Sequence, residues 1–219
     1  MTTPAEEVAA RIEAATAIRR LSHSLMAHRP DTATLAQITA SATALADDLE
    51  SHEQRCHPFK AAADFSMPKP LKVEAGELEK PKQLFADSVV SGKANPMGMD
   101  ASLWTDGDEA VMEVVLGPAF EGAPDRAHGG VMAALIDELM GQVLGIIGTP
   151  AFTGRLTVTY RNPTPLGVPL IGRARATEWK GRKISMTAEV HAGETLIAES
   201  EALFISVDPE RFIIGAPSA

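Results

Sequence analysis

A nearly unbroken run of apolar residues from Gly129 to Ile147 is the strongest pattern in the chain. Apolar residues would occupy every face of this predicted helix, which is typical of a helix enclosed by the fold. Two carboxylates, Asp137 and Glu138, interrupt the run near its middle. Because a buried carboxylate is unfavourable unless it is paired, hydrogen-bonded or protonated, an acid kept there indicates a chemical role.

Alternating apolar and polar residues on both sides of this helix predict β-strands. One strand is predicted before the helix, over 109–116, and four after it, over 153–161, 169–179, 183–191 and 195–207. The Ala-Gly-Glu sequence at 192–194 predicts a hairpin turn between the last two strands. This order predicts an α+β fold in which an antiparallel sheet wraps around one helix.

The first 51 residues show helical spacing and predict a helical hairpin. Apolar residues recur every three or four positions from Val8 to Met26, and Asp31-Thr32 is expected to cap a second helix that runs to about Leu49. Residues 52–95 are rich in proline and lack periodicity, which predicts an irregular linker or cover. The predicted parts are therefore 1–51, 52–95 and 96–219, with the hairpin as an accessory cover packed on the main body or on a partner subunit.

Composition and charge exclude several classes. A net charge of −9 argues against general nucleic-acid binding. The single cysteine, Cys56, excludes an internal disulfide framework. No apolar run approaches the roughly 20 residues of a membrane span, and the N-terminus lacks a signal-peptide core. A cytoplasmic location is expected.

Basic residues gather in one stretch of this acidic chain. Between residues 155 and 183, seven basic residues stand against one acid, Glu178; the basic residues are Arg155, Arg161, Arg173, Arg175, Lys180, Arg182 and Lys183. Two interpretations remain open. The stretch would suit a compact polyanion such as a nucleotide, or it forms a solvated strand face with salt-bridged arginines.

A set of spaced residues resembles the hotdog-fold acyl-CoA thioesterases of the PaaI-like branch. The set comprises Phe120-Glu-Gly, His128-Gly129-Gly130, Asp137 nine residues after the histidine, Thr153, and the run from Thr159 to Pro163. The resemblance covers roughly residues 96–207. It implies a hotdog fold with an N-terminal helical extension, an acyl-CoA substrate, and a homodimer or dimer of dimers.

The resemblance also implies roles for individual residues. Asp137 would be the catalytic carboxylate, Gly130 the backbone N–H donor to the thioester carbonyl, and Thr153 the hydroxyl that positions water or the aspartate. His128 would hold the loop, and Gly129 would let the substrate approach the backbone closely. A helix N-terminus suits a developing oxyanion independently of any resemblance.

Two further features concern substrate binding. Many relatives carry asparagine six residues before the histidine, whereas this chain has Gly122, so Thr153 or backbone groups must take over that role. Arg182 and Lys183 resemble the place where relatives meet the coenzyme A phosphates, and Arg161 is a further candidate; as sequence alone, Arg182 and Lys183 also fit an ordinary basic turn. The aromatic and sulfur side chains of Phe120, Phe152, Met132 and Met140 indicate an apolar acyl tunnel.

Helix geometry predicts how the site is assembled. Gly130 and Asp137 share a helix face but lie ~10.5 Å apart along the axis, so one thioester carbon cannot contact both. Two such helices packed antiparallel across a two-fold axis would bring them together, and a site shared between subunits is expected.

Several alternatives stay open. Asp137 could be a structural acid, with Glu138 as the catalytic one, although Glu138 better fits a structural partner for an arginine. The histidines at 23, 28, 52 and 57 lack metal-ligand spacing, and no cofactor motif is found. The leading function is acyl-CoA hydrolysis. The alternative is a non-catalytic acyl-CoA-binding or regulatory hotdog protein, and a dehydratase fits less well.

Overall fold

A computed structural model describes residues 4–54 and 87–208 of the 219-residue chain. Cys56, His57 and most of the predicted linker lie outside these residues. The division into a hairpin, a linker and a main domain therefore stays a prediction, although the helices and strands on either side of the linker can be compared with it.

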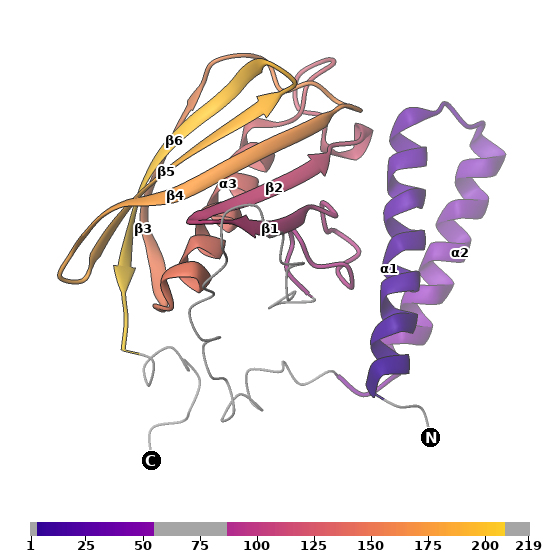
Figure 1. Ribbon diagram of the computed structural model, residues 1–219. Coiled ribbons are helices and arrows are strands. Elements are labelled where there is room, and N and C mark those ends of the chain that lie inside the picture. Colours follow the sequence, from indigo (N-terminus) through magenta and orange to yellow (C-terminus); the bar gives the residue numbers. More distant parts are fainter. Residues whose placement is uncertain (1–3, 55–86, 209–219) are drawn as a thin grey trace.

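Six antiparallel strands form one sheet (Figure 1), in the order β1-β2-β4-β5-β6-β3. The strands are β1 (Ser102–Asp106), β2 (Glu109–Val115), β3 (Ala151–Tyr160), β4 (Pro169–Lys180), β5 (Lys183–Ala192) and β6 (Thr195–Ser206). All five predicted strands are present, and the predicted turn is the two-residue link between β5 and β6.

The sequence did not reveal β1. This strand has five residues and pairs only with β2 at the edge of the sheet. Leu103 is its one buried side chain, and three of its other residues are half-buried. A short edge strand with so little alternation gives a weak signal.

Helix α3 (Gly129–Ile147) lies across the inner face of the sheet (Figure 1). Its buried side chains form one stripe at helical spacing: Met132, Leu135, Ile136, Leu139, Met140, Val143 and Leu144. The helix ends at Gly148, whose φ of 65° lies in the left-handed region that favours glycine. The sheet, β2 and β4 above all, provides the core against which this stripe packs.

The prediction that α3 is enclosed on every face is wrong for a single chain. Asp137 and Glu138 are half-buried, and a side chain added at Gly141 or Gly145 would meet nothing within 4 Å. The physical reason is that one sheet covers only one side of a helix. Within residues 4–54 and 87–208, the outward face of α3 around Gly141 and Gly145 is left open.

The expectation that no apolar run approaches the length of a membrane span is wrong for α3. Among the described residues, it is the one helix whose length and mean hydropathy, 1.6, would allow it to cross a membrane. The same match is given by helices that form the core of a fold. Because one face of α3 packs on the sheet and the helix carries Asp137 and Glu138, the match is weak evidence for a membrane span.

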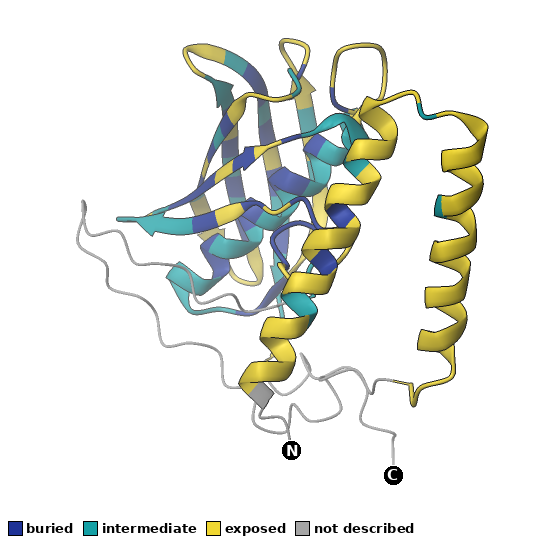
Figure 2. Cartoon of the chain, turned by 90° about the vertical axis from the view of Figure 1, so that its right-hand side faces the viewer, coloured by how far each residue is buried: buried dark blue, intermediate teal, exposed yellow. Residues whose placement is uncertain are grey.

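The N-terminal residues form two helices, α1 (Pro4–Ala27) and α2 (Thr32–Glu50), as the periodicity predicts. Asp31 caps α2 by accepting a hydrogen bond from the Thr34 N–H (2.7 Å), and its hydrogen bonds to the start of the helix lower the pKa of its carboxyl. Helix α1 contacts the short 3-10 helix η3 (Pro118–Phe120). Helix α2 lies beyond α1 and has no buried residue (Figure 2).

Two neighbouring valines on β2 test the inner and outer faces of the sheet. Val114 is 3% exposed in the core and Val115 is 52% exposed on the other face. Replacing Val114 by alanine removes two buried methyl groups and leaves a cavity, so we expect the free energy of unfolding to fall by about 2 kcal/mol. Val115→Ala should lower it by about 0.5 kcal/mol. Urea unfolding measures both, and equal losses would show that the faces are assigned wrongly.

Candidate active site

The structure brings together two of the predicted site residues, one from α3 and one from β3. The Thr153 hydroxyl donates a hydrogen bond to Asp137 Oδ1 over 2.8 Å. Thr153 lies where the pairing of β3 with β6 shifts by one residue, at Gly154. Such a bulge changes the direction of the neighbouring side chains, and here Thr153 reaches the open face of α3.

The first turn of α3 is held by two side chains. His128 caps the helix, and its Nδ1 accepts from the Gly130 N–H (2.9 Å). The Tyr160 hydroxyl on β3 donates to the Gly129 carbonyl (2.8 Å). In this chain, therefore, the N–H predicted to polarise a carbonyl is bonded to its own cap. Within the described part of the chain, the Gly129 N–H has no assigned acceptor.

Gly122 is a requirement of the loop before α3. A Cβ at Gly122 would lie 2.7 Å from the His128 Cα, a backbone atom that cannot move aside cheaply. The loop folds back on itself here, with the Gly122 N–H donating to the Arg126 carbonyl (3.0 Å). An asparagine at this position would force the loop away from His128, which gives a physical reason for the departure from the relatives' pattern.

Glu138 performs a different task from its neighbour. Its carboxylate accepts hydrogen bonds from the Ser88 hydroxyl, the Ser91 hydroxyl and the Ser91 N–H, the last over 3.2 Å. The expected arginine partner is therefore wrong, because serines of the segment before β1 take that place. Glu138 fastens this segment to α3 through both of its carboxylate oxygens, whereas Asp137 accepts the Thr153 hydroxyl on Oδ1.

Acids on the same strand or on neighbouring strands pair with four of the seven basic residues of this stretch. Arg173 pairs with Asp106 and Glu109, and these hydrogen bonds raise the pKa of its guanidinium. The remaining pairs are Arg175 with Glu109, Arg161 with Glu199, and Lys180 with Glu178. The salt-bridged interpretation thus holds for these residues, including the candidate Arg161.

Arg182 and Lys183 lie apart from these pairs, at the turn between β4 and β5. Lys183 is opposite Ile205 of β6, and Ile205 is opposite Phe152 of β3, the residue before Thr153. Neighbouring strands are ~4.8 Å apart, so the turn lies at the Thr153 end of the sheet, about two strand spacings away. The Arg182 Nε–H donates to the Ser206 carbonyl (3.0 Å).

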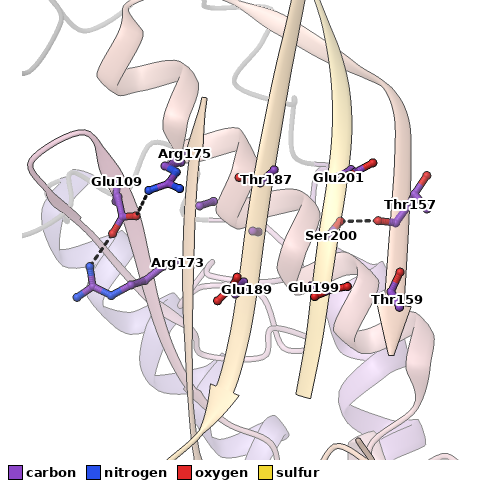
Figure 3. A pocket seen from close by; sticks show the side chains of 12 residues that line it. Glu109, Thr157, Thr159, Arg173, Arg175, Thr187, Glu189, Glu199, Ser200 and Glu201 are labelled. Atoms are coloured by element: carbon purple, nitrogen blue, oxygen red, sulfur yellow. Dashed lines mark hydrogen bonds and ion pairs between the residues drawn. The ribbon is translucent and has the colours of Figure 1, made fainter. Parts of the chain in front are cut away.

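A cavity of about 520 Å³ lies on the outer face of the sheet (Figure 3). It is lined mainly by charged and hydroxyl side chains of four strands: Thr157, Thr159, Arg173, Arg175, Thr187, Glu189, Glu199, Ser200 and Glu201, with Glu109 from β2. None of the predicted catalytic residues lines it. The arginines of this cavity are already paired with acids, and Asp137 and Thr153 lie elsewhere.

The residues proposed for an acyl tunnel separate into two groups. Met132 and Met140 are fully buried in the core. Phe120 packs against the core from its edge, and Phe152 is 44% exposed. The interpretation of the two methionines as an open tunnel is wrong for the single chain. Among the described residues, no group of three or more His, Cys, Asp or Glu side chains could hold a metal ion.

Comparison with known proteins shows what part of the chain resembles. Residues 125–199 match the family described as Thioesterase superfamily. They include Asp137, Thr153 and the first turn of α3. The resemblance read from the sequence is thereby confirmed.

Curated relatives are similar over the same domain. The chain is 36% identical over 95 residues to acyl-coenzyme A thioesterase THEM4 of Xenopus laevis, a match that covers 42% of this chain and 43% of the relative. It is 31% identical over 96 residues to acyl-coenzyme A thioesterase THEM5 of Mus musculus, covering 43% and 39%. The chain thus spans about two fifths of the length of these relatives.

A solved structure shares the fold over most of the chain. A crystal structure described as a thioesterase superfamily protein superposes with a TM-score of 0.72 and 23% identity, and covers 89% of this chain and 90% of its own. The predicted hotdog fold, an antiparallel sheet around one helix with N-terminal helices, is confirmed.

Mutation can distinguish the structural role of Glu138 from the role of Asp137. Glu138→Ala leaves the serine donors at 88 and 91 without their acceptor, so we expect a loss of about 1–3 kcal/mol in the free energy of unfolding. Amide hydrogen exchange over 87–95 should accelerate. Asp137→Asn, as the matched control one position away, should leave both measurements near the parent values. Faster exchange in the control alone would reverse the two assignments.

Proposed function

We propose that the protein is an acyl-CoA thioesterase, which hydrolyses a thioester to a free acid and coenzyme A. The observation that carries this proposal is the hydrogen-bonded pair of Asp137 and Thr153 on the open face of α3, inside a thioesterase superfamily domain. The match to curated acyl-coenzyme A thioesterases over the same residues supports it.

Asp137 carries the chemistry in this proposal. The Thr153 hydroxyl occupies Oδ1 and orients the carboxylate, and Oδ2 is left for water. As water attacks the carbonyl carbon, Asp137 takes its proton and the C=O electrons move onto oxygen. Collapse of this intermediate breaks the C–S bond, and the thiolate of coenzyme A recovers the proton. Direct attack by the carboxylate, with hydrolysis of the anhydride afterwards, is the other route open to the same residue.

The first turn of α3 stabilises the oxyanion. Backbone N–H groups and the positive end of the helix dipole favour developing negative charge. We assign the principal donor to Gly130, as the sequence predicts. In the free chain His128 Nδ1 accepts this N–H, so the substrate oxygen has to share or replace that acceptor. The neighbouring Gly129 N–H is a second donor of the same turn. Tyr160 bonds the Gly129 carbonyl, which shares a peptide plane with the Gly130 N–H and so fixes the orientation of the principal donor.

These groups meet only across two subunits. The unbroken helix α3 keeps Gly130 and Asp137 of one chain ~10.5 Å apart. Among the described residues, no strand pairs with the outer edge of the ten-residue strand β3 and no layer covers α3 around Gly141 and Gly145. The hydrogen bond between Thr153 and Asp137 places these two surfaces side by side. A long uncovered edge strand favours pairing with another strand. We propose a homodimer, alone or as a dimer of dimers, that pairs these surfaces and shares the site.

Coenzyme A would enter at the Arg182 and Lys183 turn. These two cations lie at the Thr153 end of the sheet, and no acid of the described chain pairs with them. Their charge suits the phosphates of the coenzyme handle. The cytoplasmic location expected from the sequence also stays a proposal.

Asp137→Asn tests the chemistry. The substitution keeps the shape and removes the base, so turnover of the best acyl-CoA should fall by about 100-fold or more while the protein stays folded. Thiol release across a panel of acyl lengths measures it. Parent turnover in the variant would reject Asp137. The absence of thiol release from the parent on every substrate would favour a binding protein.

Arg182→Ala combined with Lys183→Ala tests the coenzyme contact. The Michaelis constant for acyl-CoA should rise, more at low salt because screening is weaker there. Hydrolysis of the matching acyl-pantetheine, which lacks the nucleotide phosphates, should stay near the parent rate. Equal losses on both substrates would mean that the change disturbed the fold or the acyl site.

A further inference from the structure

Helix α1 holds the loop before α3 through His23. The His23 Nδ1 accepts a hydrogen bond from the Ala119 N–H (3.1 Å), although 96 residues separate the two in the sequence. The imidazole also packs edge-on against the Phe120 ring, with centroids 5.2 Å apart. Because Nδ1 is the acceptor, the ring is neutral and carries its proton on Nε2.

The loop is shaped to receive this side chain. A Cβ at Gly117 would lie 2.6 Å from His23 Nδ1 and 2.8 Å from its Cε1. Only glycine at position 117 lets the helix approach this closely. Both sides of the contact are therefore specific, with His23 on α1 and a glycine at position 117 of the loop. A non-specific packing of a surface helix would not need a glycine there.

The contact is continuous with the candidate site. The Phe120 carbonyl accepts from the His128 N–H (2.9 Å), and His128 Nδ1 in turn accepts from the Gly130 N–H. His23 thus holds η3, η3 holds His128, and His128 holds the first turn of α3. A shift of η3 would be passed to the N–H groups that the proposed function uses.

The same helix fastens a second segment beside the site. Arg19, one turn before His23 and 9% exposed, donates through Nη1 to the carbonyls of Lys93 (3.0 Å) and Asn95 (2.7 Å). This segment contains the serines that bind Glu138, the neighbour of Asp137. Helix α1 therefore braces both the oxyanion loop and the segment behind the carboxylates.

We propose that α1 is a structural part of the active site and that His23 is a positioning residue, which sets the oxyanion loop through Ala119 and Phe120. The proposal rests on the thioesterase function proposed above. It differs from the expectation that the N-terminal hairpin is an accessory cover. Helix α2, which buries no residue, takes no part in it.

The contact depends on pH. Burial, and secondly the charge of Arg19, lower the pKa of His23 from 6.5. Arg19 is the charged group that acts on the ring from α1, and the η3 residues Pro118, Ala119 and Phe120 do not titrate. Since the folded pKa is the lower one, the stabilisation is present above about pH 6.5 and is lost as the pH falls through the folded value.

Two substitutions test separately the hydrogen-bond acceptor of His23 and the packing of its ring. His23→Asn keeps an acceptor, Oδ1, at the position of Nδ1 but does not titrate, and His23→Phe keeps a ring without an acceptor. We expect kcat to fall about tenfold in the Phe variant, the scale of one lost hydrogen bond. The Asn variant should recover most of this loss, with the Michaelis constant changed little in both. His28→Asn, an exposed position one residue beyond α1, is the matched control and should behave as the parent.

A second measurement is independent of activity. Amide exchange over 117–130 should accelerate in the Phe variant and not in the Asn variant. The melting temperature of the parent relative to the Asn variant should be constant above pH 7 and decline below about pH 6.5. If the Phe variant does not fold, Gly117→Ala, which pushes a methyl group into the ring, is measured instead.

The outcomes separate the two proposals. Parent-like kcat and exchange in the Phe variant, or equal loss in the Asn and Phe variants, would overturn the positioning role. If the parent hydrolyses no acyl-CoA, the proposed function fails, and the exchange measurement alone decides the role of His23. Faster exchange confined to the Phe variant would still support it.

Discussion

The packing of α3 against the sheet by one face is the constraint on which the rest of the molecule depends. At Gly172 on β4, an added Cβ would meet Leu139 of α3 at 2.8 Å and Met112 of β2 at 3.1 Å, so the helix lies as close to the sheet as glycine allows. The inner stripe is fully sealed. No layer of the described residues covers the opposite face, which carries half-buried Asp137, so a substrate and a second subunit can reach the helix there.

Because only one face of α3 packs on the sheet, the adjacent carboxylates Asp137 and Glu138 have different surroundings and different tasks. Successive residues of a helix point about 100° apart, so Asp137 and Glu138 face different neighbours. Glu138 meets two serine hydroxyls and a backbone N–H, which use its acceptor capacity in holding the segment before β1. Asp137 meets a single hydroxyl and keeps one oxygen for other partners. A carboxylate with unused acceptor capacity on an open face is the one suited to activate water.

Charge on the sheet follows from strand neighbours. In the sequence, Arg173 and Arg175 have no neighbouring acid. In the fold, the antiparallel pairing of β2 with β4 places Glu109 beside both. These exposed pairs contribute little to stability. Their main consequence is that the outer face carries little free positive charge, while the turn at Arg182 and Lys183 keeps its own.

The sequence by itself determined the central helix, five of the six strands, the helical hairpin, and the candidates Asp137 and Thr153. Local periodicity and capping signals are enough for such elements, and a family motif supplied the candidate site residues. Only the tertiary structure decided which residues these side chains contact. The serines of Glu138, the His23 contact with η3 and the Tyr160 contact with Gly129 join residues 31 to 96 positions apart. Contacts over such separations depend on how the elements pack, and no periodic pattern in the chain records them.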